Sequence, residues 1–225
     1  MSTAAALFAQ AASAGRSSLN NAELKALLDC LGLAFDVEAP ADPVDVRISL
    51  NSTREFGMVI SAGLGGLEAD LDEGNFRRDR ASVYAAAALT DAEDFLGLFR
   101  RTLAYQKLAA VAQRDGAPLP DEALKACFAQ LLALAKSFAP ASLMRPSCCV
   151  ALELNPVQVR GGVTVRAGHC EFGAPDAIRL PRPIAKIDKL IHPKSIGIIG
   201  VSGSGGMNFG RIILRNFIVA AATRK

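Results

Sequence analysis

The spacing of apolar and polar residues changes within one stretch near the C-terminal end of the chain. Residues Ser195 to Val201 form a short run of mostly branched apolar side chains, which is typical of a buried parallel strand. From about Phe209 the apolar residues recur at steps of three and four, which predicts a helix. Six turn-forming residues separate the two, and we expect them to form a loop: Ser202, Gly203, Ser204, Gly205, Gly206 and Asn208.

This predicted strand, glycine loop and helix N-terminus together form a geometry that cradles phosphate. Free backbone N–H groups point outward, the helix dipole favours an anion, and glycine allows a close approach. A bare tight turn is the alternative interpretation. The glycine spacing differs from the Gly-x-Gly-x-x-Gly pattern of dinucleotide sites, which argues against a dinucleotide ligand.

Helical spacing also marks the N-terminal residues. Residues 3–14 are rich in Ala and predict one helix. A second helix is expected over 22–31, with Asn20 or Asn21 as its N-cap and Gly32 at its C-terminal end.

Alternation of apolar and polar residues then replaces the helical spacing. The segments 46–50 and 56–61 read as strands, and residues 51–55 join them into a predicted β-hairpin. Three glycines lie within residues 63–66, at the end of the second strand. They indicate either a tight bend or a close approach of the backbone to a ligand.

Two helices are expected in the middle of the chain. The segment Thr90 to Glu93 has the sequence of a capping box, which predicts a helix over about 91–105. Asp121 is the expected N-cap of a helix over 122–138.

A second hairpin and a linker follow these helices. Residues 148–154 and 163–166 are predicted strands, with a turn signal at Gly161-Gly162 between them. Prolines then become frequent, so residues 173–189 are the expected linker between two domains.

Composition and charge exclude several classes of protein. The chain is 51% hydrophobic with a net charge of +3 and dispersed Lys and Arg, which gives no case for a nucleic-acid footprint. No apolar run approaches the roughly 20 residues of a membrane span. The five cysteines are odd in number and lack metal-type spacing, so we interpret them as reduced thiols of a cytoplasmic protein.

Two stretches taken together resemble one family. Leu190 to Ser202, with Gly206, Asn208 and Gly210 after it, resembles the opening of the CoA-binding domain of NDP-forming acyl-CoA synthetases. These are the relatives of ADP-forming acetyl-CoA synthetase and succinyl-CoA synthetase. The resemblance implies a Rossmann-like domain whose loop from Gly200 to Gly210 holds the phosphates of coenzyme A.

The upstream residues resemble the second half of the same family's ATP-grasp domain. The matching stretches are Phe56 to Gly66 and Glu153-Leu-Asn-Pro-Val157, with a helical lead-in from Gly15 to Leu31. In the family, the Glu-x-Asn-Pro motif helps to hold the magnesium of the nucleotide, which implies Glu153 and Asn155 as metal ligands and ATP with Mg²⁺ as cofactors. The alternative is a strand end in which Asn155 satisfies the backbone of a turn.

The expected fold is therefore α/β, a truncated ATP-grasp-like subdomain followed by the first strand, glycine loop and helix of a Rossmann-like CoA-binding domain. Its segments are a helical lead-in over 1–35, an ATP-grasp-like second half over 36–172, the linker over 173–189 and an incomplete CoA-binding domain over 190–225. One strand and one helix cannot form a sheet alone. We therefore expect a homo-oligomer or further domains beyond Lys225.

The chain departs from the family at three places. Between Leu33 and Val46 the small nucleotide-binding subdomain, with its lysine for the phosphates, is replaced by about a dozen residues. The family has a second metal-binding aspartate at a place that corresponds to Arg166 to His169 here. Ala167 stands at the expected position of that aspartate. The domain that carries the family's phosphorylated histidine is not found in this sequence, and no residue is assigned a catalytic role.

Two functions remain open at this point. In the first, the chain is part of an acid–thiol ligase that joins a carboxylate to CoA at the expense of a nucleoside triphosphate. In the second, it is a non-catalytic CoA-binding, regulatory or subunit-interaction module derived from that family. Binding of CoA without binding of Mg-ATP would favour the second.

Overall fold

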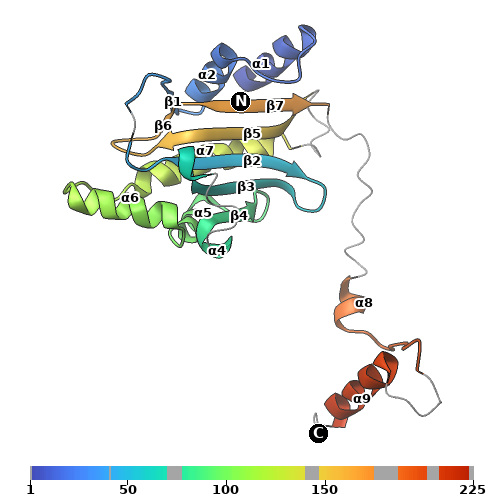
Figure 1. Ribbon diagram of the computed structural model, residues 1–225. Coiled ribbons are helices and arrows are strands. Elements are labelled where there is room, and N and C mark those ends of the chain that lie inside the picture. Colours follow the sequence, from blue (N-terminus) through green and yellow to red (C-terminus); the bar gives the residue numbers. More distant parts are fainter. Residues whose placement is uncertain are drawn as a thin grey trace. The chain divides into compact units, whose positions relative to one another are not determined.

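The computed structural model describes residues 2–40, 42–69, 78–139, 147–174, 187–201 and 208–222. The chain divides into two compact units, Met1–Arg179 and Leu180–Lys225. Each unit is described by itself below (Figure 1).

A mixed and mostly antiparallel sheet forms the centre of the first unit (Figure 1). Its described strands are β1 Ala34–Phe35, β2 Val46–Thr53, β3 Gly57–Leu64, β4 Ser82–Ala86, β5 Cys148–Gln158, β6 Thr164–Val165 and β7 Gly168–Gly173. The order is β1-β6-β5-β2-β3-β4, and β7 also pairs with β5. Only the β1–β6 pair is parallel among the described strands. The central strand β5 thus has β2 on one side and both β6 and β7 on the other.

Helices complete the first unit. They are α1 Ser2–Ser13, α2 Asn21–Cys30, α4 Arg78–Ala81, α5 Ala92–Phe99, α6 Leu103–Arg114 and α7 Asp121–Ser137, with a short 3-10 helix at Gly66–Glu68. Figure 1 shows α7 running behind the sheet, on the face turned away from the viewer. Aromatic rings fix α5 against α7, because the Phe95 and Phe99 rings both meet that of Phe128 edge to face, with centroids 4.8 and 5.7 Å apart.

The period of two along β2 separates a core face of the sheet from a polar face. Val46, Ile48 and Leu50 are buried, whereas Arg47 and Ser49 are only half-buried. The predicted hairpin of β2 and β3 is confirmed, with Ser49 opposite Ser61 in its register.

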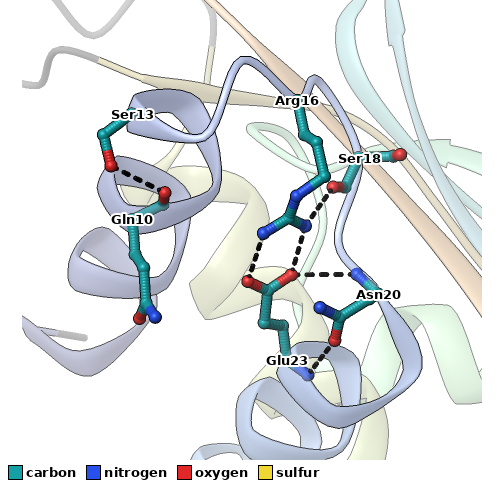
Figure 2. Close-up of polar contacts among 6 residues, drawn as sticks. All are labelled: Gln10, Ser13, Arg16, Ser18, Asn20 and Glu23. Carbon is teal, nitrogen blue, oxygen red and sulfur yellow. Dashed lines mark hydrogen bonds and ion pairs between the residues drawn. The ribbon is translucent and has the colours of Figure 1, made fainter.

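The two N-terminal helices are confirmed, and the sequence signal at the start of α2 is sound. Asn20 caps this helix: its side chain accepts from the Glu23 N–H, while the Glu23 carboxylate accepts from the Asn20 N–H, each at 2.9 Å. Arg16 donates to both carboxylate oxygens of Glu23, at 2.6 and 2.7 Å (Figure 2). The loop between the two helices is thereby tied to the first turn of α2.

The single helix predicted over 91–105 is wrong, because the chain forms two helices there. Thr102 lies between them as the N-cap of α6: its hydroxyl donates to the Phe99 carbonyl at 2.7 Å and accepts from the Tyr105 N–H at 3.3 Å. The N-cap of α5 is Asp91 and not Thr90. A threonine that competes for backbone groups interrupts a helix that its apolar pattern alone would continue.

The predicted cap of α7 is also wrong. Pro120 occupies the N-cap position and makes no side-chain cap bond. Asp121 is the first helical residue, and its carboxylate accepts instead from the Tyr105 hydroxyl and the Arg100 guanidinium, each at 2.7 Å. The Asp121 side chain, which the local sequence pattern assigned to the N-cap, is therefore used in a tertiary contact instead.

The second hairpin is confirmed but is larger than its sequence pattern predicts. β5 continues past the expected end at Leu154 to Gln158, and β6 pairs with its last residues. The strands β1, β4 and β7 were not predicted. β7 lies where the sequence pattern gives way to the expected linker, and it is held by pairing with β5 rather than by local turns.

The second unit contains α8 Ile187–Ile191 and α9 Phe209–Ala222. The helix predicted from Phe209 is confirmed, but the strand predicted over Ser195–Val201 is wrong. The described residues of this segment pair with no strand, and Ile199 is 98% exposed. An apolar, branched run has the composition of a strand, but a strand also needs a hydrogen-bonded partner.

Candidate functional site

Glu153 and Asn155 lie on the polar face of the sheet, as their period-two spacing predicts. Leu152 and Leu154 point to the core and are buried, whereas Glu153 between them is exposed. In the strand register Glu153 is opposite Ser49 of β2 and His169 of β7.

Polar side chains continue across this face. Ser49 and Ser61 hydrogen-bond to each other with their hydroxyl oxygens 2.7 Å apart, and Asn51 donates to the Ser49 hydroxyl at 3.0 Å. The His169 ring approaches the Glu171 carboxylate at 3.1 Å. These contacts form a hydrogen-bonding surface that could hold a polar ligand.

The Asn155 side chain is already engaged. Its carbonyl oxygen accepts from the Gly66 N–H at 2.7 Å, so it satisfies the backbone of the glycine turn. The Asn155 N–H donates to the Ala167 carbonyl at 3.0 Å, which places Ala167 beside the Glu-x-Asn-Pro strand end.

The glycines at 63–66 form a tight bend. A Cβ on Gly65 would lie 2.4 Å from the Val46 carbonyl carbon, and one on Gly63 would lie 2.2 Å from the Ser82 hydroxyl. Gly66 has φ +59°, in the region that glycine favours. Packing between neighbouring strands therefore explains these glycines without a ligand.

The two predicted metal ligands do not by themselves fit magnesium. Mg²⁺ needs several hard oxygen ligands in near-octahedral geometry. Of this pair, the Asn155 oxygen is bonded to Gly66, which leaves only the Glu153 carboxylate. In the part of the chain that the structure describes, no three His, Cys, Asp or Glu side chains are grouped to hold a metal ion.

Two charged residues at this strand end were not singled out as site residues from the sequence. Asp45, just before β2, and Arg166, just after β6, each have one buried polar atom without a hydrogen-bond partner, Oδ1 and Nε respectively. Burial raises the pKa of the Asp45 carboxyl, although the charge of Arg166 acts in the opposite direction. The sequence signal for Arg166 was a charged residue directly after an apolar strand, and for Asp45 one directly before such a strand.

The described parts of the predicted phosphate loop lie at its two ends. Gly200 has φ +85°, and a Cβ on Gly210 would lie 2.8 Å from the Gly200 carbonyl oxygen, so the two backbones are in contact. Asn208 caps α9, because its side chain accepts from the Arg211 N–H at 2.9 Å. The other predicted loop residues, Ser202, Gly203, Ser204, Gly205 and Gly206, lie outside the described residues.

A cavity of about 520 Å³ shares no lining residue with either predicted site. It lies between α6, the start of α7 and the β5–β6 turn, with mostly apolar walls. Arg160 of the turn and Asp115 at the end of α6 both line it and form an ion pair at 2.9 Å.

Comparison with solved structures establishes the fold. The dinucleotide-forming acetyl-coenzyme A synthetase 1 of Ca. Korarchaeum cryptofilum, in complex with coenzyme A and Mg-AMPPCP, aligns at a TM-score of 0.57 and 18% identity, over 76% of this chain and 100% of that chain. PH1788 from Pyrococcus horikoshii aligns at a TM-score of 0.60 and 14% identity, over 77% of this chain and 99% of that chain. The chain shares their fold.

The apo form of the Korarchaeum enzyme gives the same result, with a TM-score of 0.59 at 17% identity over 76% of this chain and 100% of that one. No family model and no curated protein matches the sequence. Among the described residues, no helix is both long and apolar enough to span a membrane.

Proposed function

We propose that this chain is part of an NDP-forming acyl-CoA synthetase, an acid–thiol ligase, and that its loop from Gly200 to Gly210 binds coenzyme A. The observation that carries the proposal is the shared fold, which spans the whole of an acetyl-coenzyme A synthetase chain whose structure holds coenzyme A and Mg-AMPPCP. The family resemblance of Glu153 to Pro156 and of Leu190 to Ser202 supports the same assignment.

The polar face of the first unit is the proposed nucleotide side. It offers the hydroxyls of Ser49 and Ser61, the amide of Asn51 and the carboxylate of Glu153 on neighbouring strands. Hydroxyl and amide groups can donate to phosphate or ribose oxygens, and they also accept hydrogen bonds.

The contact between Gly200 and Gly210 supports the proposed CoA side. Glycines at such positions let a loop and the helix after it pack closely, and the N–H groups at the start of a helix attract phosphate. The Asn208 cap uses one of these N–H groups, that of Arg211.

Calorimetric titration of the full chain with CoA tests this assignment. We expect saturable binding, and we expect Gly205→Asp to weaken it about tenfold, since a carboxylate in the loop repels phosphate by about 1.4 kcal/mol. Gly197→Asp is the matched control, because a side chain there meets no atom within 4 Å. Equal CoA affinity in the two variants would refute the loop assignment.

The second candidate function is a non-catalytic module, and the engaged Asn155 oxygen favours it. Titration with Mg-ATP separates the two. An acyl-CoA synthetase chain binds nucleotide and CoA, whereas the module binds CoA alone. Binding of neither would remove both ligand assignments.

A further inference from the structure

A phosphate site at the strand end near Asn155 would require a source of positive charge. A site for nucleotide phosphates needs positive charge, which a divalent cation or a basic side chain can supply. Of the two predicted magnesium ligands, Asn155 has its side-chain oxygen bonded to Gly66, and Glu153 is exposed. A lone exposed carboxylate is a poor basis for a magnesium site.

Arg166 brings a positive charge to the same strand end. Its backbone N–H donates to the Pro156 carbonyl at 3.0 Å, and the next residue, Ala167, accepts from the Asn155 N–H. Arg166 is therefore fixed by main-chain bonds to the strand opposite the Asn-Pro pair.

Asp45 lies at the same place from the other side. Its backbone carbonyl accepts from the Gly65 N–H at 2.9 Å, and a Cβ on Gly66 would lie 2.6 Å from the Asp45 Oδ2 atom. Because Gly66 also donates to the Asn155 oxygen, Asp45, Asn155 and Arg166 surround one corner of the sheet.

Two buried polar atoms at this corner have no hydrogen-bond partner among the described residues. Arg166 Nε is a buried donor and Asp45 Oδ1 a buried acceptor, and neither makes a hydrogen bond. Buried polar atoms are rarely left unpaired in folded proteins. The Arg166 donor suits an acceptor such as a phosphate oxygen or a water, whereas the Asp45 oxygen suits a donor such as a water.

We propose that Arg166 supplies the positive charge of this site in place of a divalent cation, and that the site binds a phosphate group without metal. The identity of that phosphate, as part of a nucleotide, rests on the proposed function. The comparison with a divalent cation rests on the family resemblance of Glu153 to Pro156, whereas Mn²⁺ binding at this strand end can be measured independently of nucleotide binding. Arginine suits this role because its fork of N–H donors matches phosphate oxygens and it stays charged at any accessible pH.

Binding of Mn²⁺ to the full chain, followed by electron paramagnetic resonance, tests the exchange directly. Mn²⁺ prefers the same oxygen ligands as Mg²⁺ and loses its sharp signal when bound. We expect no saturable binding to the wild-type chain. Saturable binding that Glu153→Gln abolishes would overturn the proposal.

A charge reversal provides the complementary measurement. Arg166→Asp places a carboxylate beside Asp45 and should create saturable Mn²⁺ binding, which the double variant Asp45→Asn/Arg166→Asp should lose. Arg54→Asp makes the same charge change on the exposed β2–β3 turn and should gain nothing. If folded Arg166→Asp behaves as Arg54→Asp does, Arg166 does not occupy a cation position.

The phosphate arm uses ATP titrated in EDTA and then in MgCl₂. We expect equal affinity in both and an approximately tenfold loss in Arg166→Gln, which corresponds to about 1.4 kcal/mol. Affinity that requires Mg²⁺ would overturn the proposal. If ATP does not bind at all, the nucleotide part of the proposed function fails, while the Mn²⁺ results still decide whether Arg166 replaces a metal.

Discussion

The side-chain oxygen of Asn155 and the N–H of Gly66 are hydrogen-bonded at 2.7 Å across 89 positions of sequence. This bond joins the Glu-x-Asn-Pro strand end to the glycine turn after β3. Both segments carry the family resemblance, and here they are partners of each other.

Removing this bond should destabilise the first unit. Asn155→Ala leaves the partly buried Gly66 N–H unpaired, so we expect a loss of about 1–2 kcal/mol in the free energy of unfolding. Urea denaturation followed by circular dichroism measures it. Asn155→Asp keeps an acceptor oxygen and is the matched control; similar midpoints for the Ala and Asp variants would contradict the role assigned to the bond.

The ion pair of Arg16 and Glu23 should make stability depend on pH in the acid range. Hydrogen bonds from Arg16 and from the Asn20 N–H lower the pKa of Glu23 from 4.5 to about 2. A lowered folded-state pKa stabilises above the unfolded value, so the contribution is complete above about pH 5 and is lost as the pH falls toward 2.

Melting temperatures measured between pH 2 and 7 check this dependence. Glu23→Gln should flatten the acid side of the profile, whereas Glu38→Gln, at an exposed loop position, should leave it unchanged. A Glu23→Gln profile parallel to that of the wild type would show that other carboxylates govern the acid transition.

Two glycines should respond to alanine in opposite directions. Gly65→Ala puts a Cβ 2.4 Å from the Val46 backbone, so the strands must separate and the chain should lose several kcal/mol of stability. Gly97 lies within α5 with no atom near its missing side chain, and Gly97→Ala should gain about 0.5–1 kcal/mol. Chemical denaturation of both variants would reveal the contrast, and equal shifts would argue against the close approach at Gly65.

The junction of α5 and α6 depends on a hydroxyl. Thr102 is fully buried and bonds to backbone groups of both helices. We expect Thr102→Ala to cost about 1–2 kcal/mol, in the range of a lost N-cap. Thr102→Ser retains the hydroxyl and should recover most of that loss; failure to do so would assign the effect to the methyl group.

The cysteines should differ sharply in reactivity. Cys30 is exposed, whereas Cys127, Cys148, Cys149 and Cys170 are buried. Burial raises the pKa of Cys127 to about 12, which removes its reactive thiolate at neutral pH. Ellman's reagent at pH 8 should therefore label one thiol quickly in the native chain and five after unfolding, and Cys30→Ser should abolish the fast reaction.

Local signals explain the elements that the sequence predicts well. Asn20 and Glu23 form a capping box within four residues, and the β2–β3 hairpin joins neighbouring strands. β7 escaped prediction because its pairing with β5 is a tertiary contact. The apolar run from Ser195 to Val201 misled for the converse reason, since composition alone cannot show a pairing partner.

In the candidate site, too, local features could be predicted from the sequence and tertiary ones could not. The spacing of Glu153 and Asn155 predicts their shared face, and the Asn155 oxygen accepts from the backbone of the glycine turn, the bond that the alternative interpretation of this residue expects. The proximity of Asp45 to the charge of Arg166 could not be predicted, because it depends on how β2, β5 and β6 assemble. Neither Asp45 nor Arg166 lies in a sequence motif from which the other residue could be inferred.

The pairing of β2 with β5 also constrains how the protein is made. Leu50 lies opposite Leu152, roughly a hundred positions later in the chain. A nascent chain that has reached only α7 carries the apolar side chains of β2 with one edge of that strand unpaired, a state prone to association with other chains. Synthesis must pass β5 before the sheet can close, so we expect slow, late folding on the ribosome and a benefit from chaperones that shield this edge.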